Sequence, residues 1–115
     1  MEKLFIRIPI ADSAPVGPGK TQLLELVAET GSIRAAAIKM RLSYRRAWML
    51  LAEMEKSFGA PVLARQTGGK RGGGAQLTPL GSDIVKHFRA AERAAIKAIQ
   101  PELAALNRLK KRGPD

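Results

Sequence analysis

Five basic side chains and no carboxylate lie in the first twenty-two residues of the stretch from Gly31 to Gly59. Guanidinium groups bind phosphate oxygens, and their planar fork also pairs with the two acceptors on the major-groove edge of guanine. A stretch that gathers such groups without carboxylates is therefore suited to contact with DNA. The basic residues are Arg34, Lys39, Arg41, Arg45 and Arg46.

The net charge is concentrated in the same part of the chain. The 115 residues carry +10 in total, and the isoelectric point is near 10.7. Residues 1–30 carry −1, residues 31–74 carry +7 and residues 75–115 carry +4. This uneven distribution favours a nucleic acid partner over a generally basic surface. The absence of cysteine excludes disulfides, thiolate metal sites and cysteine nucleophiles, and it suits a reducing cytosol.

Two helices separated by a short turn explain the spacing of apolar residues in this stretch. Gly31 is expected to end a preceding helix, and Ser32 to cap the next one. The turn Met40–Leu42 follows, Ser43 caps a second helix, and Gly59 ends it. The buried faces are predicted to be Ile33, Ala36, Ala37 and Met40, then Ala47, Leu51, Met54 and Phe58. Such a helix pair is typical of a helix-turn-helix, whose second helix reads DNA.

The N-terminal turn of the second helix holds side chains that we expect to contact bases and phosphates. Arg45 and Arg46 lie near a helix N-terminus, where the macrodipole favours anions, so their position is unfavourable without an anionic partner. The alternative is a solvated basic helix start. Trp48 lies beside the buried face, so we expect it to be half-buried, with the sugar–phosphate backbone as its alternative contact. The predicted contacts of this turn are Ser43, Tyr44, Arg45, Arg46 and Met49.

The N-terminal segment is expected to form a strand, a loop and a helix. Alternating apolar residues predict a strand over Lys3–Ile10, near a sheet edge because of Pro9. Turn residues predict a loop over Asp12–Gly19, and an apolar stripe predicts a helix over Lys20–Glu29.

Residues Ala14–Thr21 fit a loosened phosphate-loop pattern, which raises the alternative of a nucleotide hydrolase at Lys20. Alanine replaces the first glycine of that pattern, and two prolines remove backbone donors from the proposed cradle. We therefore interpret Gly17–Lys20 as a loop that enters the helix.

A β-hairpin with a glycine-rich tip is expected after the second helix. Strands over Pro61–Thr67 and Ala75–Thr78 flank the tip, Gly68–Gly74. As a wing, the hairpin would bring Lys70 and Arg71 to a flanking groove or to phosphates. The alternative is a mobile turn without a ligand, but the two charges favour the wing.

Thr78 and Pro79 are expected to open a last helix, as cap and first residue. Pro101 should kink or restart this helix, and Glu102–Lys111 continues it. The helix is longer than one small core can cover, so we expect its far half to pack on a second copy. A membrane-surface helix is the alternative, but the stripe is rich in alanine and has no aromatic anchor beyond Phe88. The stripe consists of Leu80, Ile84, Phe88, Ala91, Ala95 and Ile99.

No group of residues indicates a catalytic or metal site. His87 is the sole histidine, so it has neither the further ligands of a metal centre nor the partners of a catalytic triad. We therefore expect no enzymatic activity, no cofactor and no metal.

Several segments together match a known family in order, over about residues 16–90. The most specific are the Ser-Tyr-x-x-Ala-Trp element and the glycine-rich tip. On these segments the chain resembles the N-terminal DNA-binding domain of the molybdate-responsive ModE regulators and, more distantly, the LysR-type winged helix. The segments are Gly17–Lys20, Gly31–Ile33 with Ala35–Ala37, Ser43–Trp48, Gly68–Gly74 and Leu77–Gly81.

The resemblance implies a dimeric winged helix-turn-helix transcription regulator. It implies that Ser43, Tyr44, Arg45 and Arg46 enter the major groove. It also implies backbone or minor-groove contacts for Arg34, Lys70 and Arg71. ModE regulators bind molybdate in C-terminal oxyanion-binding domains that have no counterpart in this sequence, so we expect a stand-alone DNA-binding domain without an effector domain.

These inferences predict a mainly helical fold with a small β-wing, as one domain over residues 1–115. Residues 1–15 would form a strand and loop, 16–82 the winged-helix core, and 83–111 a dimerisation helix. The predicted function is sequence-specific regulation of transcription by a homodimer on double-stranded DNA, in the cytoplasm of a prokaryote and associated with the nucleoid. The alternative is a protein-interaction module that dimerises or docks on another regulator.

Overall fold

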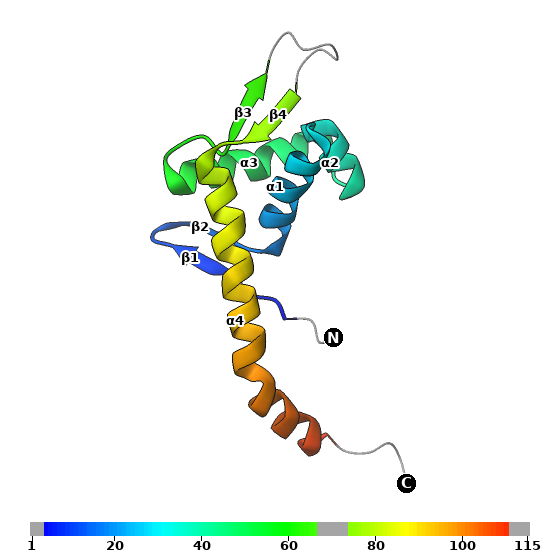
Figure 1. The fold of residues 1–115 in the computed structure, drawn as a ribbon, viewed down its shortest axis with the longest axis vertical. Helices are drawn as coiled ribbons and strands as arrows, with labels where there is room; N and C mark the ends of the chain where they lie inside the picture. The colour runs from blue at the N-terminus through cyan, green and yellow to red at the C-terminus, as the bar shows by residue number, and fades with distance from the viewer. Residues whose placement is uncertain (1–3, 67–73, 111–115) are drawn as a thin grey trace.

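The computed structural model describes residues 4–66 and 74–110. A helical core lies between two antiparallel hairpins, and a long helix runs away from it, so that the molecule measures 65 × 31 × 20 Å (Figure 1). This confirms a mainly helical fold with a small β-wing and a long C-terminal helix. The elements are β1 (Ile8–Ile10), β2 (Ser13–Val16), α1 (Pro18–Thr30), α2 (Ile33–Lys39), α3 (Tyr44–Phe58), β3 (Leu63–Gln66), β4 (Gly74–Leu77) and α4 (Pro79–Leu109).

The central helices begin and end at the predicted residues because their capping signals are local. Gly31 adopts the left-handed conformation with φ 72°, which ends α1. The Ser32 hydroxyl accepts the Ala35 N–H at 3.0 Å, and the Ser43 hydroxyl accepts the Arg46 N–H at 3.0 Å. The predicted inner faces of α2 and α3 are buried, with Met40 and Phe58 half-buried at their ends.

The N-terminal segment differs from the prediction. Within the described part of the predicted strand, Leu4–Ile10, only Ile8–Ile10 pair as a strand, although burial alternates along the whole of it as predicted. The predicted loop contains β2, which pairs with β1 through Ile8 and Val16. The helix α1 also starts earlier than predicted, at Pro18, because proline suits the first helical position.

The second hairpin is attached to the helical core at its base. Strands β3 and β4 pair from Leu63–Leu77 outward, as predicted for a wing. The Ala75 N–H donates to the Gly31 carbonyl at 2.9 Å, which joins β4 to the end of α1. The predicted wing contacts Lys70 and Arg71 lie outside the described residues.

Helix α4 starts against the core and then leaves it. The Thr78 hydroxyl accepts the Gly81 N–H at 3.1 Å, as predicted for the cap. A Cβ at Gly81 would lie 2.3 Å from the Val62 carbonyl oxygen, so glycine permits this close approach. Ile84 and Phe88 are buried, whereas the stripe beyond them is only partly covered.

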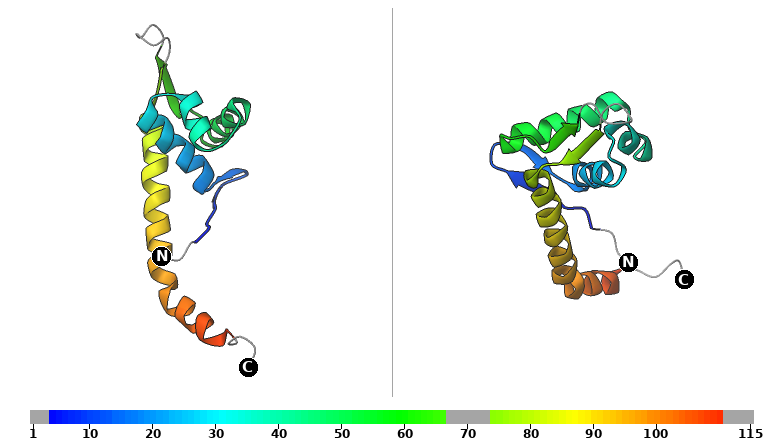
Figure 2. Two further views of the ribbon diagram at one scale, coloured as in Figure 1. Left: turned by 90° about the vertical axis from the view of Figure 1, so that its right-hand side faces the viewer. Right: turned by 45° about the horizontal axis from the view of Figure 1, so that its top comes forward.

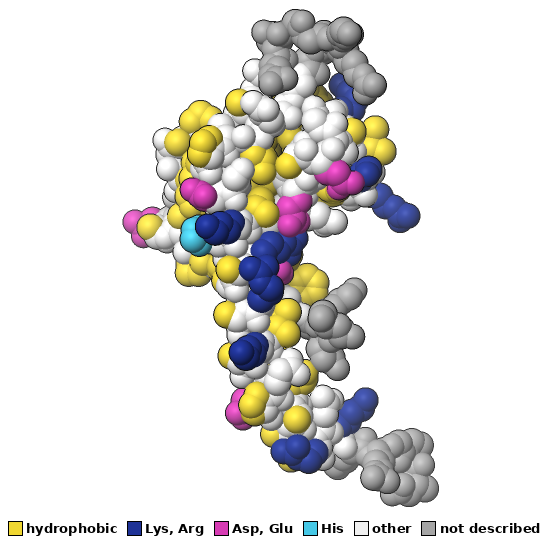
Figure 3. All heavy atoms as spheres, viewed as in Figure 1, with side chains coloured by type: hydrophobic (Ala, Val, Ile, Leu, Met, Phe, Trp, Pro, Cys, Tyr) yellow, Lys and Arg dark blue, Asp and Glu magenta, His cyan; other side chains and the backbone are white. Residues whose placement is uncertain are grey.

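The helix does not restart at Pro101. It stays continuous to Leu109, and its axis bends in the part coloured orange (Figure 2). Leu106 and Leu109 are 63% and 76% exposed. Hydrophobic side chains alternate with basic ones along the visible face of the far half (Figure 3).

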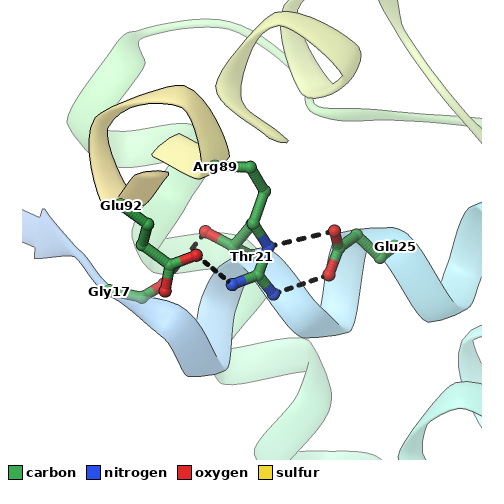
Figure 4. A network of polar contacts seen from close by, with 5 residues as sticks. All are labelled: Gly17, Thr21, Glu25, Arg89 and Glu92. Carbon is green, nitrogen blue, oxygen red and sulfur yellow. Dashed lines mark hydrogen bonds and ion pairs between the residues drawn. The ribbon is translucent and has the colours of Figure 1, made fainter. Parts of the chain in front are cut away.

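An arginine between two carboxylates fixes α4 to α1 (Figure 4). Arg89 donates to Glu25 through Nε at 3.1 Å and through Nη2 at 2.7 Å. It also donates through Nη1 to Glu92, one turn further along α4, at 2.7 Å. These charge-assisted hydrogen bonds help to hold α4 against α1.

Candidate nucleic-acid interface

The N-terminal half of α3 presents the predicted contact residues at the surface. Arg45 is exposed, and Tyr44 and Met49 are 37% and 47% exposed. At 3.6 residues per turn, Arg45 and Met49 each lie about 160° around the helix from buried Ala47. They therefore point most directly away from the core.

Four side chains form a continuous ladder across α2, α3 and β3. The Arg34 guanidinium lies 4.4 Å from the centre of the Tyr44 ring. The Tyr44 and Trp48 rings meet edge to face at 6.1 Å, with 86° between their planes. The Arg65 guanidinium lies 4.9 Å from the centre of the Trp48 ring. We call these four residues the aromatic ladder.

The ladder joins two predicted contacts, Arg34 and Tyr44, to a residue that the sequence analysis did not predict. Trp48 is half-buried as predicted, and the Arg65 guanidinium lies over its ring. Arg65 was not predicted, because only the folded hairpin brings strand β3 beside α3. The positive charge of residue 65 within the basic central stretch was the one available signal.

The carboxylates of the central stretch are occupied elsewhere. Glu53 pairs with Lys20 at 3.1 Å. Glu55 accepts the Val62 N–H at 3.0 Å. Within residues 4–66 and 74–110, no ion pair within 4 Å involves the arginines at this surface, namely Arg34, Arg41, Arg45, Arg46 and Arg65. The surface is therefore cationic without internal neutralisation.

Arg46 lies on a different flank of α3 from the ladder. It lines a groove of about 810 Å³ together with Arg7, Gly17 and Glu53. The structure therefore brings Arg34 and Tyr44 together, leaves Arg45 and Met49 on the outermost face, and separates Arg46 from them. Ser43 is exposed at the start of the helix, where its hydroxyl acts as the cap.

The phosphate-loop pattern has a structural role in this fold. Lys20 is buried in the first turn of α1, where its ammonium donates to the Pro15 carbonyl at 3.0 Å and pairs with Glu53. Its charge is therefore already neutralised by a carboxylate. In the described part of the chain, no three His, Cys, Asp or Glu side chains gather into a metal site. None of the described helices is both long and apolar enough to cross a membrane.

The sequence pattern of the bacterial regulatory helix-turn-helix proteins of the lysR family matches residues 19–82. This match spans more than half of the chain and contains α2, α3 and the wing, so the chain belongs to that family. The family is one of DNA-binding transcription regulators, which agrees with the cationic surface around α3.

Two relatives specify the similarity further. The chain is 38% identical over 94 residues to the molybdenum-pterin-binding protein MopB of Rhodobacter capsulatus, covering 82% of this chain and 35% of that protein. It is 32% identical over 110 residues to the transcriptional regulator ModE of Haemophilus influenzae, covering 93% of this chain and 43% of that protein. These matches confirm the resemblance to molybdenum-related regulators. The chain spans less than half the length of these curated relatives.

A solved structure shows the same fold. The protein chain of the CbnR_DBD–DNA complex superposes with a TM-score of 0.59 and 23% sequence identity. The alignment covers 76% of this chain and 95% of that chain.

Proposed function

We propose that this protein binds a specific double-stranded DNA sequence through α3 and thereby regulates transcription. The observation that carries the proposal is the arginine surface around the N-terminus of α3. Of the carboxylates in the central stretch, Glu53 pairs with Lys20 and Glu55 accepts the Val62 N–H, so neither pairs with these arginines. Such a surface repels itself in the free protein and is stabilised by a polyanion. The function is binding rather than catalysis.

The exposure of each side chain supports a division of roles. Arg45 and Met49 point furthest from the core, so they would meet base edges in the major groove. Ser43, Tyr44 and Arg46 would contact bases or the groove wall. Arg34, with Lys70 and Arg71 of the wing, would contact phosphates or the minor groove.

A homodimer through α4 would present two such surfaces. The exposed leucines of its far half, Leu106 and Leu109, support this pairing. Two-fold symmetry then implies a pseudo-palindromic site with half-sites about one DNA turn, or a multiple of it, apart. The protein would act in the prokaryotic cytoplasm, at the nucleoid.

The relatives direct the proposal toward molybdenum-related genes. This connection rests on the name of MopB and on the similarity to ModE. Both relatives are longer proteins than this chain. We propose that the described domain supplies the DNA binding by which such genes are regulated.

Selection of bound duplexes from a random pool, followed by titration at several salt concentrations, tests the proposal. We expect an enriched pseudo-palindromic sequence and a steep fall in affinity with salt, because several cations meet phosphates. A pool without enrichment and a flat salt response would contradict the proposal.

An interaction module is the second candidate, favoured by the exposed leucines of α4. In that case residues 83–110 would dock on another regulator and the protein would not bind DNA by itself. Footprinting with the purified protein distinguishes the two functions, because only the first predicts protection of a duplex.

A further inference from the structure

The two ends of the aromatic ladder are arginines with the same unusual setting. Each guanidinium lies over an aromatic ring, Arg34 at 4.4 Å from Tyr44 and Arg65 at 4.9 Å from Trp48. A guanidinium that lies over a ring uses its face for that contact, and its N–H groups at the edge remain available for hydrogen bonds. In the described part of the chain neither arginine has a carboxylate within ion-pair distance.

The ladder also fixes where these charges lie. Tyr44 and Trp48 are one helical turn apart on α3, and their edge-to-face contact links the two cation sites. Arg34 comes from α2 and Arg65 from β3, so three separate elements hold the pair. Long side chains normally lose conformational freedom on binding, and a site that is already ordered avoids part of this cost.

We propose that Arg34 and Arg65 bind two backbone phosphates of DNA, one at each end of the ladder, and that Trp48 is the positioning residue for Arg65. This inference rests on the proposed function, because it assigns phosphate contacts to the same DNA-binding surface. The chemistry at each site is a phosphate diester oxygen that accepts hydrogen bonds from a guanidinium edge. The contacts carry no base preference, so they set register and affinity rather than sequence choice.

The salt dependence of DNA binding by the full chain tests the two arginines. Each of Arg34→Gln and Arg65→Gln removes one phosphate contact, so the slope of log affinity against log salt should fall by about 0.9. Affinity at 0.15 M salt should fall by about fivefold, equally on a specific and on an unrelated duplex. Arg65→Lys keeps the charge and should keep the slope, although it loses the planar contact with the ring.

A matched control removes a positive charge away from the proposed DNA-binding surface and from the proposed dimer contact. Lys86 is exposed in the near half of α4, two residues from buried Ile84 and two from buried Phe88, so it points away from the core. Lys86→Gln should leave the slope unchanged. A slope that falls equally in Lys86→Gln and Arg65→Gln would overturn the inference, because the effect would then follow net charge alone.

A double-mutant cycle tests the role of Trp48. Trp48→Leu removes the ring but keeps the Arg65 charge, so Arg65→Gln should weaken binding less in that background than in the wild type. Trp48→Phe keeps an aromatic face and should keep the coupling. Circular dichroism verifies folding of each variant, and if Trp48→Leu fails to fold, Trp48→Met, which also removes the ring, replaces it in the cycle.

The outcomes separate the inference from the proposed function. A steep wild-type slope that Arg34→Gln and Arg65→Gln leave unaltered overturns the inference and leaves DNA binding intact. Additive losses in the cycle of Trp48→Leu and Arg65→Gln overturn the positioning role. A wild-type protein that binds no duplex overturns the proposed function as well.

Discussion

The arginine that joins α4 to α1 and the arginines around α3 have opposite surroundings. On α4, Arg89 lies between Glu25 and Glu92 and forms hydrogen bonds with both. Around α3, Arg45 and Arg65 are exposed and have no carboxylate partner among the described residues. The charge of Arg89 is already compensated, so the cations available to an anionic partner in this comparison are those around α3.

The two settings have different physical consequences. The hydrogen bonds with Glu25 raise the pKa of Arg89 further above its ordinary value, although burial opposes them and Glu92 adds to them. The charge of Arg89 is thereby used to hold α4 on α1. The charges around α3 are held near one another without such compensation, which favours an anionic partner.

The largest expected effect is the loss of an unpaired arginine from the outer face of α3. Arg45→Ala should weaken binding to the selected site by roughly 1–3 kcal/mol if this residue reads a base, with unfolding nearly unchanged. Arg46→Ala should cost less, because Arg46 lies on the flank that faces the groove beside Arg7. Titration with selected and unrelated duplexes measures both.

The unrelated duplex serves as the control for base reading. Arg45→Ala should reduce affinity for the selected site more than for the unrelated one. If Arg45→Ala and Arg46→Ala both bind the selected duplex as the wild type does, the assignment of α3 as the recognition helix is wrong.

The second effect concerns the paired arginine. Arg89→Met should lower the free energy of unfolding by about 1–2 kcal/mol, because it removes charge-assisted hydrogen bonds and leaves two carboxylates close together. The salt slope of DNA binding should stay the same, since this charge is already neutralised. Denaturant unfolding and the salt titration measure the two quantities, with Arg89→Lys as the variant that keeps the charge. If Arg89→Met lowers the slope of log DNA affinity against log salt, the paired Arg89 also contacts DNA, which would contradict its contrast with the arginines around α3.

Local signals account for what the sequence predicted well. Serine caps, left-handed glycines and spacings of three and four residues act within one turn of chain, and they placed α2 and α3 with their buried faces. The burial alternation along Leu4–Ile10 was equally local and was also correct.

Contacts between residues that are distant in the sequence account for the features that the sequence did not predict. Strand β2 has the sequence Ser13-Ala-Pro-Val and exists because β1 pairs with it, which composition alone does not indicate. Arg65 reaches Trp48 only after the hairpin folds back on α3. The pairing of Lys20 with Glu53 likewise joins two helices, so the sequence alone did not show how the phosphate-loop lysine is used.

A third effect separates capping from DNA contact. Ser43→Ala and Ser32→Ala each remove a cap hydrogen bond of 3.0 Å, so each should lower stability by about 1 kcal/mol. Ser43 lies at the predicted interface and Ser32 does not belong to the predicted contacts. At equal stability, Ser43→Ala should therefore weaken DNA binding more than Ser32→Ala does. If the two variants bind DNA with the same affinity, Ser43 does not contact DNA.

The smallest expected effect concerns Lys39, which has a carboxylate partner as Arg89 does but is more exposed to solvent. Lys39 pairs with Glu29 at 3.5 Å, and both side chains are more than half exposed, at 53% and 65%. Water and salt screen such a pair, so Glu29→Gln should change the unfolding free energy by less than about 0.5 kcal/mol. The same change frees the Lys39 charge at the edge of the basic stretch, so DNA affinity should rise slightly at low salt and return to the wild-type value at high salt. A decrease in affinity would mean that the Glu29 carboxylate holds Lys39 in place for DNA, a role like the one that we propose for Trp48 toward Arg65.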